Sequence, residues 1–281
     1  MQRLQILIDN LTKFRKIHIS ILDLSGILDA EILKIEFKNV IHSKKFCTLA
    51  KMTEKGYAEC IRCKMLANQK AKKTKKAFFG HCAFGLFEAA VPVVIDGEVC
   101  AIVYVGNAII DEEKTVFRVN KNCRLFGICP TLLLDELKEC EPVSDFNELL
   151  EIGEIVKDYI KMLVSMKPKE KTEGHWLVSV MKKYAEEMFC EGVLLKEIAI
   201  TYQKNEKYIG RLFKKETGVT FNEYCMNMRL EKAEEFLLEG NSKIIDIAMS
   251  CGFDNISYFN RVFQKKHGMS PRAYRAINSL K

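Results

Sequence analysis

The sequence predicts two domains: an α+β N-terminal domain, with an antiparallel sheet and flanking helices, and an all-α C-terminal domain with two helix-turn-helix units joined by a long helix. Three observations support this. The 281 residues exceed what one small domain needs. Apolar residues follow both the strand and the helix period in the first half of the chain. A motif near the C-terminus occurs twice.

The expected N-terminal elements are those of a small antiparallel sheet. They are a helix at 4–11, a strand at 17–24, a charged helix at 57–73 and strands at 77–82, 88–95 and 99–105. Asp96-Gly97 has the chemistry of a two-residue hairpin turn. A long amphipathic helix follows, with Ser144 as its expected N-cap. It either packs on its own domain or forms a dimer seam, and its length does not decide between them.

A polar segment containing Pro168 and Gly174 marks the expected domain boundary. The predicted domains are therefore 1–165 and 175–281, with a linker at 166–174. No stretch approaches the ~20 apolar residues of a membrane helix, so we expect a cytoplasmic protein that does not engage a membrane. The chain has eleven cysteines and no secretory signal, which disfavours a disulfide scaffold.

The repeated motif predicts two helix-turn-helix units. Ile198-Ala199 returns as Ile247-Ala248 with an offset of 49 residues, and Gly218 returns as Gly268 with an offset of 50, so the second turn has one extra residue. The recurring apolar residues form the buried face of each unit. The expected helices are 194–202, 205–217, 221–238, 244–250 and 255–267. The central one is about 27 Å long at 1.5 Å per residue, comparable with the ~34 Å between successive major-groove windows.

About residues 174–275 closely resemble the AraC family of transcription regulators, through the Ile-Ala-x-x-x-Gly-Phe pattern at 247–253 and the ending at 268–275. In that family, the second helix of each unit enters the major groove of double-stranded promoter DNA. The resemblance implies these groove-facing residues: Lys204, Asn205, Lys207, Tyr208 and Arg211 in the first unit, and Asn255, Ile256, Ser257, Asn260 and Arg261 in the second. Arginine suits guanine, asparagine suits adenine, and Ile256 could contact a thymine methyl.

Alternatives remain for several of these residues. Arg211 and Arg261 precede buried positions and could brace phosphates or neighbouring helices instead of reading bases. Gly210 departs from relatives that often carry a polar side chain there, so direct readout should be lost at that position. The lysines that follow in each unit are expected to clamp the DNA backbone or to form a solvated face.

Four cysteines form a second informative group: Cys47, Cys60, Cys63 and Cys82. Cys60 and Cys63 project from one face of an expected helix and could share structural zinc or an iron-sulfur cluster. Buried packing thiols are the main alternative, followed by a redox pair. No Gly-rich phosphate loop or hydrolase motif accompanies them, which favours sensing over catalysis.

About residues 5–165 resemble the PocR sensory domain, a PAS-like module found beside AraC-type domains. The resemblance is carried by Phe46-Cys47, the Cys-x-x-C pattern at 60–63, the segment 81–86 and Gly106-Asn107. The family is thought to sense small hydrocarbon derivatives such as propanediols. By resemblance, the ligand-binding candidates are Cys82, Phe84, Tyr104 and Asn107. From the residues alone, Phe84 and Tyr104 are core residues. Ala83 follows Cys82 where the family usually has histidine.

The steepest charge asymmetry lies between Lys44 and Lys76, with 11 Lys or Arg and two Glu. This segment could bind an anionic ligand, DNA or RNA polymerase, although a solvated helix face is the favoured interpretation. The net charge of +7 permits nucleic-acid binding without proving it.

Together, these features predict a ligand-responsive, sequence-specific DNA-binding transcription regulator that is not an enzyme. Family habit favours an activator. The expected partners are promoter DNA, a small-molecule effector and RNA polymerase, with a homodimer as one option. A metal or redox sensor using Cys47, Cys60, Cys63 and Cys82 is the alternative. An Ada-like alkyl-DNA repair regulator is more remote, because its cysteines are spaced differently.

Overall fold

The computed structural model describes residues 2–166, 175–190, 195–240 and 242–278. Residues 167–174 of the predicted linker, and Leu194 of a predicted helix, lie outside the described residues. The chain divides into two compact units, and the main division falls beside Trp176. Each unit is described separately below.

An antiparallel sheet organises the N-terminal unit, as predicted. Its strands are β1 (His18–Asp23), β2 (Phe78–His81), β3 (Phe87–Ile95), β4 (Glu98–Ile109) and β5 (Glu141–Pro142). The order is β1-β4-β3-β2, and β5 adds a short parallel pairing to β4 that the sequence did not predict. Asp96 and Gly97 join β3 to β4 with φ of 50° and 80°, which confirms the expected hairpin.

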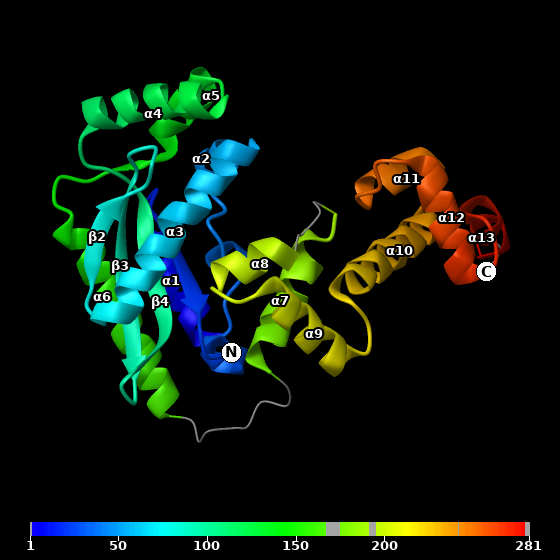
Figure 1. The fold of residues 1–281 in the computed structure, drawn as a ribbon, viewed down its shortest axis with the longest axis horizontal. Coiled ribbons are helices and arrows are strands. Elements are labelled where there is room, and N and C mark those ends of the chain that lie inside the picture. Colours follow the sequence, from blue (N-terminus) through cyan, green and yellow to red (C-terminus); the bar gives the residue numbers. More distant parts are fainter. Residues whose placement is uncertain (1, 167–174, 191–194, 241, 279–281) are drawn as a thin grey trace. The chain divides into compact units, whose positions relative to one another are not determined.

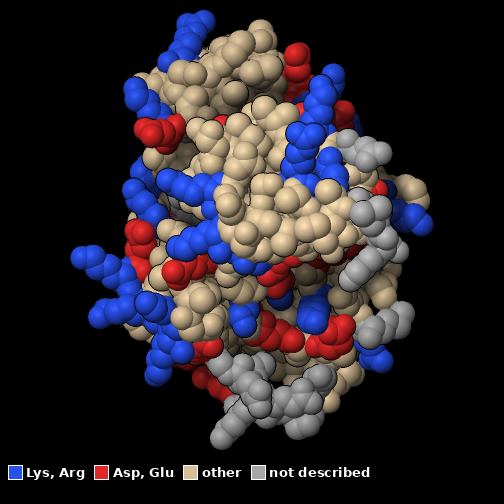
Figure 2. Space-filling view, turned by 90° about the vertical axis from the view of Figure 1, so that its right-hand side faces the viewer, with Lys and Arg blue, Asp and Glu red and all other residues tan. Residues whose placement is uncertain are grey.

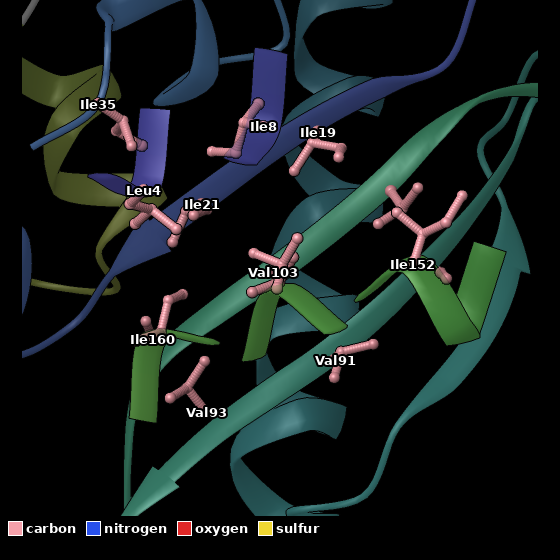
Figure 3. Packing of buried hydrophobic residues seen from close by; sticks show 14 of the residues in the cluster. Leu4, Ile8, Ile19, Ile21, Ile35, Val91, Val93, Val103, Ile152 and Ile160 are labelled. Atoms are coloured by element: carbon pink, nitrogen blue, oxygen red, sulfur yellow. The ribbon is translucent and has the colours of Figure 1, made fainter. Parts of the chain in front are cut away.

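Helices α1 (Arg3–Thr12) and α6 (Asn147–Ser165) contribute to the main hydrophobic core together with the sheet. Figure 3 shows Leu4 and Ile8 of α1 and Ile152 and Ile160 of α6 beside the strand residue Val103. The contact between α6 and β3 is close. A Cβ added at Gly153 would lie 2.6 Å from a methyl group of Val91. The apolar face of α6 therefore packs on its own domain.

A charged helix, α3 (Glu54–Thr74), packs against β3 and β4, as Figure 1 shows. Beside it, α2 (Lys45–Ala50), α4 (Glu112–Phe126) and α5 (Pro130–Glu136) surround a second apolar cluster that includes Phe46, Phe84 and Val119. Short 3₁₀ helices at Ile27–Asp29, Glu31–Leu33, Phe37–Asn39 and Leu137–Glu139 complete the domain. The sequence predicted α3 but neither α4 nor α5.

The predicted N-cap of α6 is wrong. The cap position is Phe146, and its side chain makes no capping hydrogen bond. Asp145 instead accepts a 2.9 Å hydrogen bond from the Asn147 backbone N–H. The carboxylate of Asp145 thus satisfies the free N–H group that Ser144 was expected to satisfy.

The C-terminal unit contains only helices among its described residues, as predicted. They are α7 (Trp176–Met188), α8 (Leu195–Thr201), α9 (Glu206–Thr217), α10 (Phe221–Glu239), α11 (Ile244–Ser250), α12 (Ile256–His267) and α13 (Pro271–Asn278). α8–α9 form the first helix-turn-helix unit and α11–α12 the second. α8 and α11 are 49 residues apart, whereas α9 and α12 are 50 apart. The extra residue therefore lies in the second turn, as predicted.

Candidate DNA interface and effector site

Each helix-turn-helix unit is held by apolar residues that point inward. Ile209 and Phe213 of α9, and the repeat-related Phe259 and Phe263 of α12, are all inaccessible to solvent. Both helices end at a glycine in the left-handed region, Gly218 and Gly268, which supplies the C-cap that the sequence predicted. The same backbone frame thus presents different polar side chains in the two units.

Most of the predicted base-contacting residues lie on the surface. Exposed positions in the first unit are Lys204, Asn205, Lys207, Tyr208 and Arg211, and those in the second are Asn255, Ser257, Asn260 and Arg261. Ile256 differs, because it is partly buried against the core of the second unit. Gly210 also faces inward, since an added Cβ would lie 3.1 Å from Cδ2 of Leu195.

Two of these residues cap the helices that they precede. Asn205 Oδ1 accepts a hydrogen bond from the Tyr208 N–H. Asn255 Oδ1 accepts from the N–H groups of both Ser257 and Tyr258, at 2.8 and 3.0 Å. Bidentate readout of adenine needs an amide oxygen that can accept from the base. Asn255 uses both acceptor sites of that oxygen in the cap, so only its amide N–H groups remain for DNA.

The start of α12 carries a surface hollow of about 350 Å³, lined by Asn255, Ser257, Tyr258 and Arg261. The guanidinium of Arg261 lies 5.2 Å from the centroid of the Tyr258 ring, which orients it by a cation-π contact. Tyr258 was not among the predicted groove-facing residues. Its 50-residue offset from Tyr208 was the signal that could have identified it.

Arg229 in α10 joins the two halves of the domain. Its Nε donates to the Phe189 carbonyl at 2.6 Å, and its Nη1 donates to the Gly252 carbonyl at 2.7 Å. Gly252 has φ of 80°, and a Cβ added there would lie 2.3 Å from the Cys190 carbonyl oxygen. The turn of the second unit is therefore in close contact with the segment that follows α7, which fixes the second unit relative to α10.

Charge alone does not mark the interface. Figure 2 shows Lys and Arg side chains scattered over the face in view and most numerous on its left side, with Asp and Glu side chains among them. This mixture agrees with the moderate net charge of +7. On this face, charge by itself does not separate a DNA-binding surface from the rest.

The N-terminal domain contains a group of polar side chains that the sequence analysis missed. We call His42, Lys64, Glu88 and Tyr104 the polar cluster. His42 Nε2 lies 2.8 Å from Glu88 Oε1 and 2.7 Å from Lys64 Nζ. Lys64 Nζ also lies 3.3 Å from Glu88 Oε1 and 3.1 Å from the centroid of the Tyr104 ring.

Neighbouring residues shape this cluster. The Tyr104 hydroxyl donates to Asn68 Oδ1. Gly106 leaves room for Glu88, because an added Cβ would lie 3.1 Å from Cγ of Glu88. His18 packs edge-on to His42, with 5.9 Å between ring centroids. The cluster is thus assembled from two strands, β3 and β4, the helix α3 and the segment before α2, with His18 of β1 beside it.

Neighbouring side chains keep the Glu88 carboxylate of the polar cluster ionised. Burial favours protonation of Glu88, but His42 and Lys64 outweigh this effect and lower its pKa to about 2. Burial also lowers the pKa of Lys64, His42 and His18, and the pKa of His18 falls to about 4, assisted by His42. At neutral pH Glu88 is therefore ionised, and His18 is uncharged.

Two of the four predicted metal-ligand cysteines, Cys47 and Cys60, interact electrostatically with Glu88 of this cluster. Burial raises the pKa of Cys47 and Cys60, and raises that of Cys82 to about 12; Cys60 and Cys82 each also act on Cys47 electrostatically. Partly buried, neutral thiols match the packing alternative. Among the described residues, no three His, Cys, Asp or Glu side chains are placed to hold a metal ion. Metal analysis of anaerobically purified protein tests the zinc and iron-sulfur prediction.

Two family models match the chain. One described as the sensory domain found in PocR matches residues 1–167, more than half of the chain. One described as a helix-turn-helix domain matches residues 198–277. The chain belongs to the AraC family of transcription regulators and carries a PocR sensory domain. Its helix-turn-helix domain binds DNA.

Known relatives agree with this family membership. The regulatory protein PocR of Salmonella typhimurium is 22% identical over 258 residues, which cover 85% of this chain and 84% of the relative. The bifunctional transcriptional activator/DNA repair enzyme AdaA of Bacillus subtilis is 31% identical over 108 residues, 38% of this chain and 51% of AdaA. The chain thus spans about half of AdaA.

A solved structure is also similar to part of the chain. It is the C-terminal domain of AraT, a response regulator from Geobacillus stearothermophilus, with 30% identity and a TM-score of 0.36. The similarity covers 38% of this chain and 88% of that one.

The residues that the PocR resemblance implied as ligand-binding do not gather at one site. Tyr104 is in the polar cluster, whereas Phe84 belongs to the second apolar cluster and Cys82 packs against it. The amide of Asn107 donates to the carbonyls of Lys16 and Glu139, which fixes the β5 side of the sheet. Asn107 thus has a structural role in the PocR domain.

No helix among the described parts of the chain is long and apolar enough to cross a membrane.

Proposed function

We propose that this AraC-family regulator is a ligand-responsive transcription activator whose PocR domain binds a small metabolite at the polar cluster. The observation that supports it best is that the two domains place their polar side chains differently. The C-terminal domain exposes its polar residues at the starts of α9 and α12, whereas the PocR domain encloses Lys64 and Glu88 together. In this proposal the sensor is 1–165, the linker 166–174 and the DNA-binding domain 175–281.

On the DNA side, α9 and α12 enter successive major grooves. Arg211 and Arg261 read bases, while Lys204 and Lys207 contact the backbone or base edges of the first half-site. Tyr208, Ser257, Tyr258 and Asn260 complete the two surfaces. Asn205 and Asn255 act first as caps. The two half-sites therefore differ in sequence, because the two helices present different residues.

On the effector side, the ligand acts through the sheet. Glu88 and Tyr104 belong to β3 and β4, and α6 packs against both strands from the core side. The tight approach of Gly153 to Val91 makes the position of α6 sensitive to β3. A ligand that favours one arrangement of α6 would alter the dimer or the freedom of the DNA-binding domain, by no more than its differential affinity for the two states.

Activation in this proposal involves contact with RNA polymerase, and no chemical turnover is required. The protein acts in the cytoplasm, where promoter DNA is available. Several apolar side chains of α6 are exposed, including Ile155 and Met162, which supports a homodimer seam on the face of α6 that is turned away from the sheet.

The test has two steps. A thermal-shift screen of small diols, aldehydes and related carbon compounds finds ligands, because binding to the native state raises its stability. Promoter affinity and transcription are then measured with and without each hit. We expect both to change for the wild type and not for a Lys64→Met variant that still binds DNA. Equal affinity and equal transcription with and without every hit would refute the proposal.

A further inference from the structure

The polar cluster places a primary amine where three other groups converge on it. His42 Nε2 is within hydrogen-bonding distance of both Lys64 Nζ and Glu88 Oε1. A single imidazole nitrogen either donates one hydrogen bond or accepts one. His42 therefore accepts a proton from Lys64 or donates one to Glu88, but not both at once. The arrangement lets a proton move between the amine and the carboxylate through one nitrogen.

The polar cluster is only partly closed. The side chains of Lys64, Glu88 and His42 retain 21%, 24% and 25% of their accessible surface. The cluster is therefore not sealed from solvent. The Tyr104 ring lies against the amine on one side.

We propose that Lys64 binds a small aldehyde or ketone as a reversible imine, so that the effector of the PocR domain is a carbonyl compound. This inference rests on the proposed function and names its ligand class. Primary amines are the protein groups that form Schiff bases with carbonyl compounds. An arginine or histidine at this position could pair with Glu88 equally well, but neither would form an imine.

The chemistry balances without an oxidant, a reductant or a cofactor. The Lys64 ammonium passes one proton to His42, and the freed amine attacks the carbonyl carbon, forming a C–N bond as the C=O electron pair moves to oxygen. A proton from the attacking nitrogen moves to that oxygen and gives a carbinolamine. His42 returns its proton to the hydroxyl group, which leaves as water while the nitrogen lone pair forms the C=N bond. The products are the protonated imine and one water. Hydrolysis reverses each step, so the sensor resets when the carbonyl compound is consumed.

The experiment traps the imine on the full chain. The protein is incubated with propanal and sodium cyanoborohydride at neutral pH, and the propylated peptides are mapped by mass spectrometry. We expect modification concentrated at Lys64 at low propanal, at least tenfold above the exposed lysines of the same helix. Lys73→Arg, an exposed position on α3, serves as the matched control and should leave the pattern unchanged.

Because the wild-type map locates the adduct directly, the result does not depend on any variant folding. Propylation spread evenly over surface lysines, or absent from Lys64, would overturn the inference. Promoter binding measured on the same preparation separates the two proposals. If DNA affinity still responds to a diol or another hit while Lys64 stays unmodified by propanal, the carbonyl inference fails and the ligand-responsive function stands.

Discussion

The two domains place their polar residues in opposite ways. In the C-terminal domain, the cores of both helix-turn-helix units are apolar, and the polar side chains that distinguish α9 from α12 are exposed. In the PocR domain, a lysine, a glutamate and a histidine meet against the sheet. A partner as large as DNA needs groups on the surface, whereas a small ligand can be held by groups that are largely enclosed.

The difference has energetic consequences that mutations can measure. Removing a charged group from an enclosed cluster leaves its partner desolvated and unpaired, which costs stability. Removing a charged group from an exposed helix costs little stability, so its effect should appear only when DNA is bound. The predictions below begin with the largest expected effect.

The largest effect should come from the backbone contact that supports the second helix-turn-helix unit. Gly252→Ala should destabilise the C-terminal domain by about 3 kcal/mol, because a left-handed conformation costs a non-glycine residue ~1 to 2 kcal/mol and the added Cβ overpacks a tight contact. The contact is with the Cys190 carbonyl oxygen. Urea unfolding followed by circular dichroism measures the loss, and promoter binding should fall with it.

Gly210→Ala is the matched control for that substitution. Its added Cβ would approach only the flexible end of Leu195, and alanine gains up to about 1 kcal/mol over glycine within a helix. Stability should therefore stay the same or rise. Equal losses for both variants would show that the Gly252 contact has no special role.

A charge removed from the polar cluster should destabilise the PocR domain. Glu88→Gln keeps the size of the side chain but leaves Lys64 without its carboxylate, and we expect a loss of about 2 kcal/mol, below the range for fully buried pairs because the cluster is partly accessible. Thermal unfolding measures it. Glu98→Gln, at an exposed position on β4, should change stability by under ~0.5 kcal/mol. If Glu88→Gln and Glu98→Gln lowered stability by comparable amounts, the enclosed cluster would not differ energetically from an exposed charge.

Charges removed from the DNA-binding helices should weaken binding without destabilising the fold. Arg211→Ala and Arg261→Ala should each cost about 1.5 kcal/mol of affinity, roughly tenfold, and should relax sequence preference in different half-sites. Competition binding with base-substituted promoter fragments detects this. Lys214→Ala changes an exposed position on α9. It should reduce the salt dependence of DNA binding by the amount expected for about one phosphate contact, without relaxing sequence specificity. A uniform loss across all sequences for both arginines would identify them as backbone contacts.

The smallest effect should be a loss of stability in acid. His18 has a pKa of about 4 in the folded chain, below its usual 6.5, so the unfolded chain binds more protons between these values. Stability is therefore complete above about pH 6.5 and falls as pH drops toward 4. Between pH 7 and pH 5, we expect the protonation of His18 in the unfolded chain to lower the free energy of unfolding by about 1 kcal/mol, allowing for screening. His18→Gln should flatten this slope in thermal unfolding, whereas His81→Gln, at an exposed position, should preserve it.

Local patterns in the sequence predicted most of the fold. The repeated apolar pairs identified both helix-turn-helix units, and Asp96-Gly97 identified the hairpin, because periodicity and turn chemistry act between neighbours in the chain. α4 was missed although Asp111 and Gly127 cap its two ends. The N-cap of α6 was assigned to Ser144 because the sequence does not reveal which of two adjacent polar residues faces the free N–H groups.

The polar cluster could not be predicted in the same way. Lys64 lies in a strongly basic helix, and the favoured interpretation was that the basic side chains of this helix face solvent. That interpretation is correct for exposed neighbours such as Lys70 and Lys73. Only the packing of α3 on the sheet brings Lys64 to Glu88. His42 lies 22 residues before Lys64, and Lys64 lies 24 residues before Glu88, so no local spacing relates the three. The DNA-binding residues were easier to predict, because each residue in the first helix-turn-helix unit has an equivalent position in the second.

The central claim is that one chain reads two different DNA half-sites with two helices on a shared frame. Selection of bound sequences from a random DNA pool, using the full-length wild-type protein, tests it most directly. We predict a motif with two half-sites of unlike sequence whose centres lie about 10 to 10.5 base pairs apart, one helical turn. Two identical half-sites per chain, or a motif with a single half-site, would contradict it.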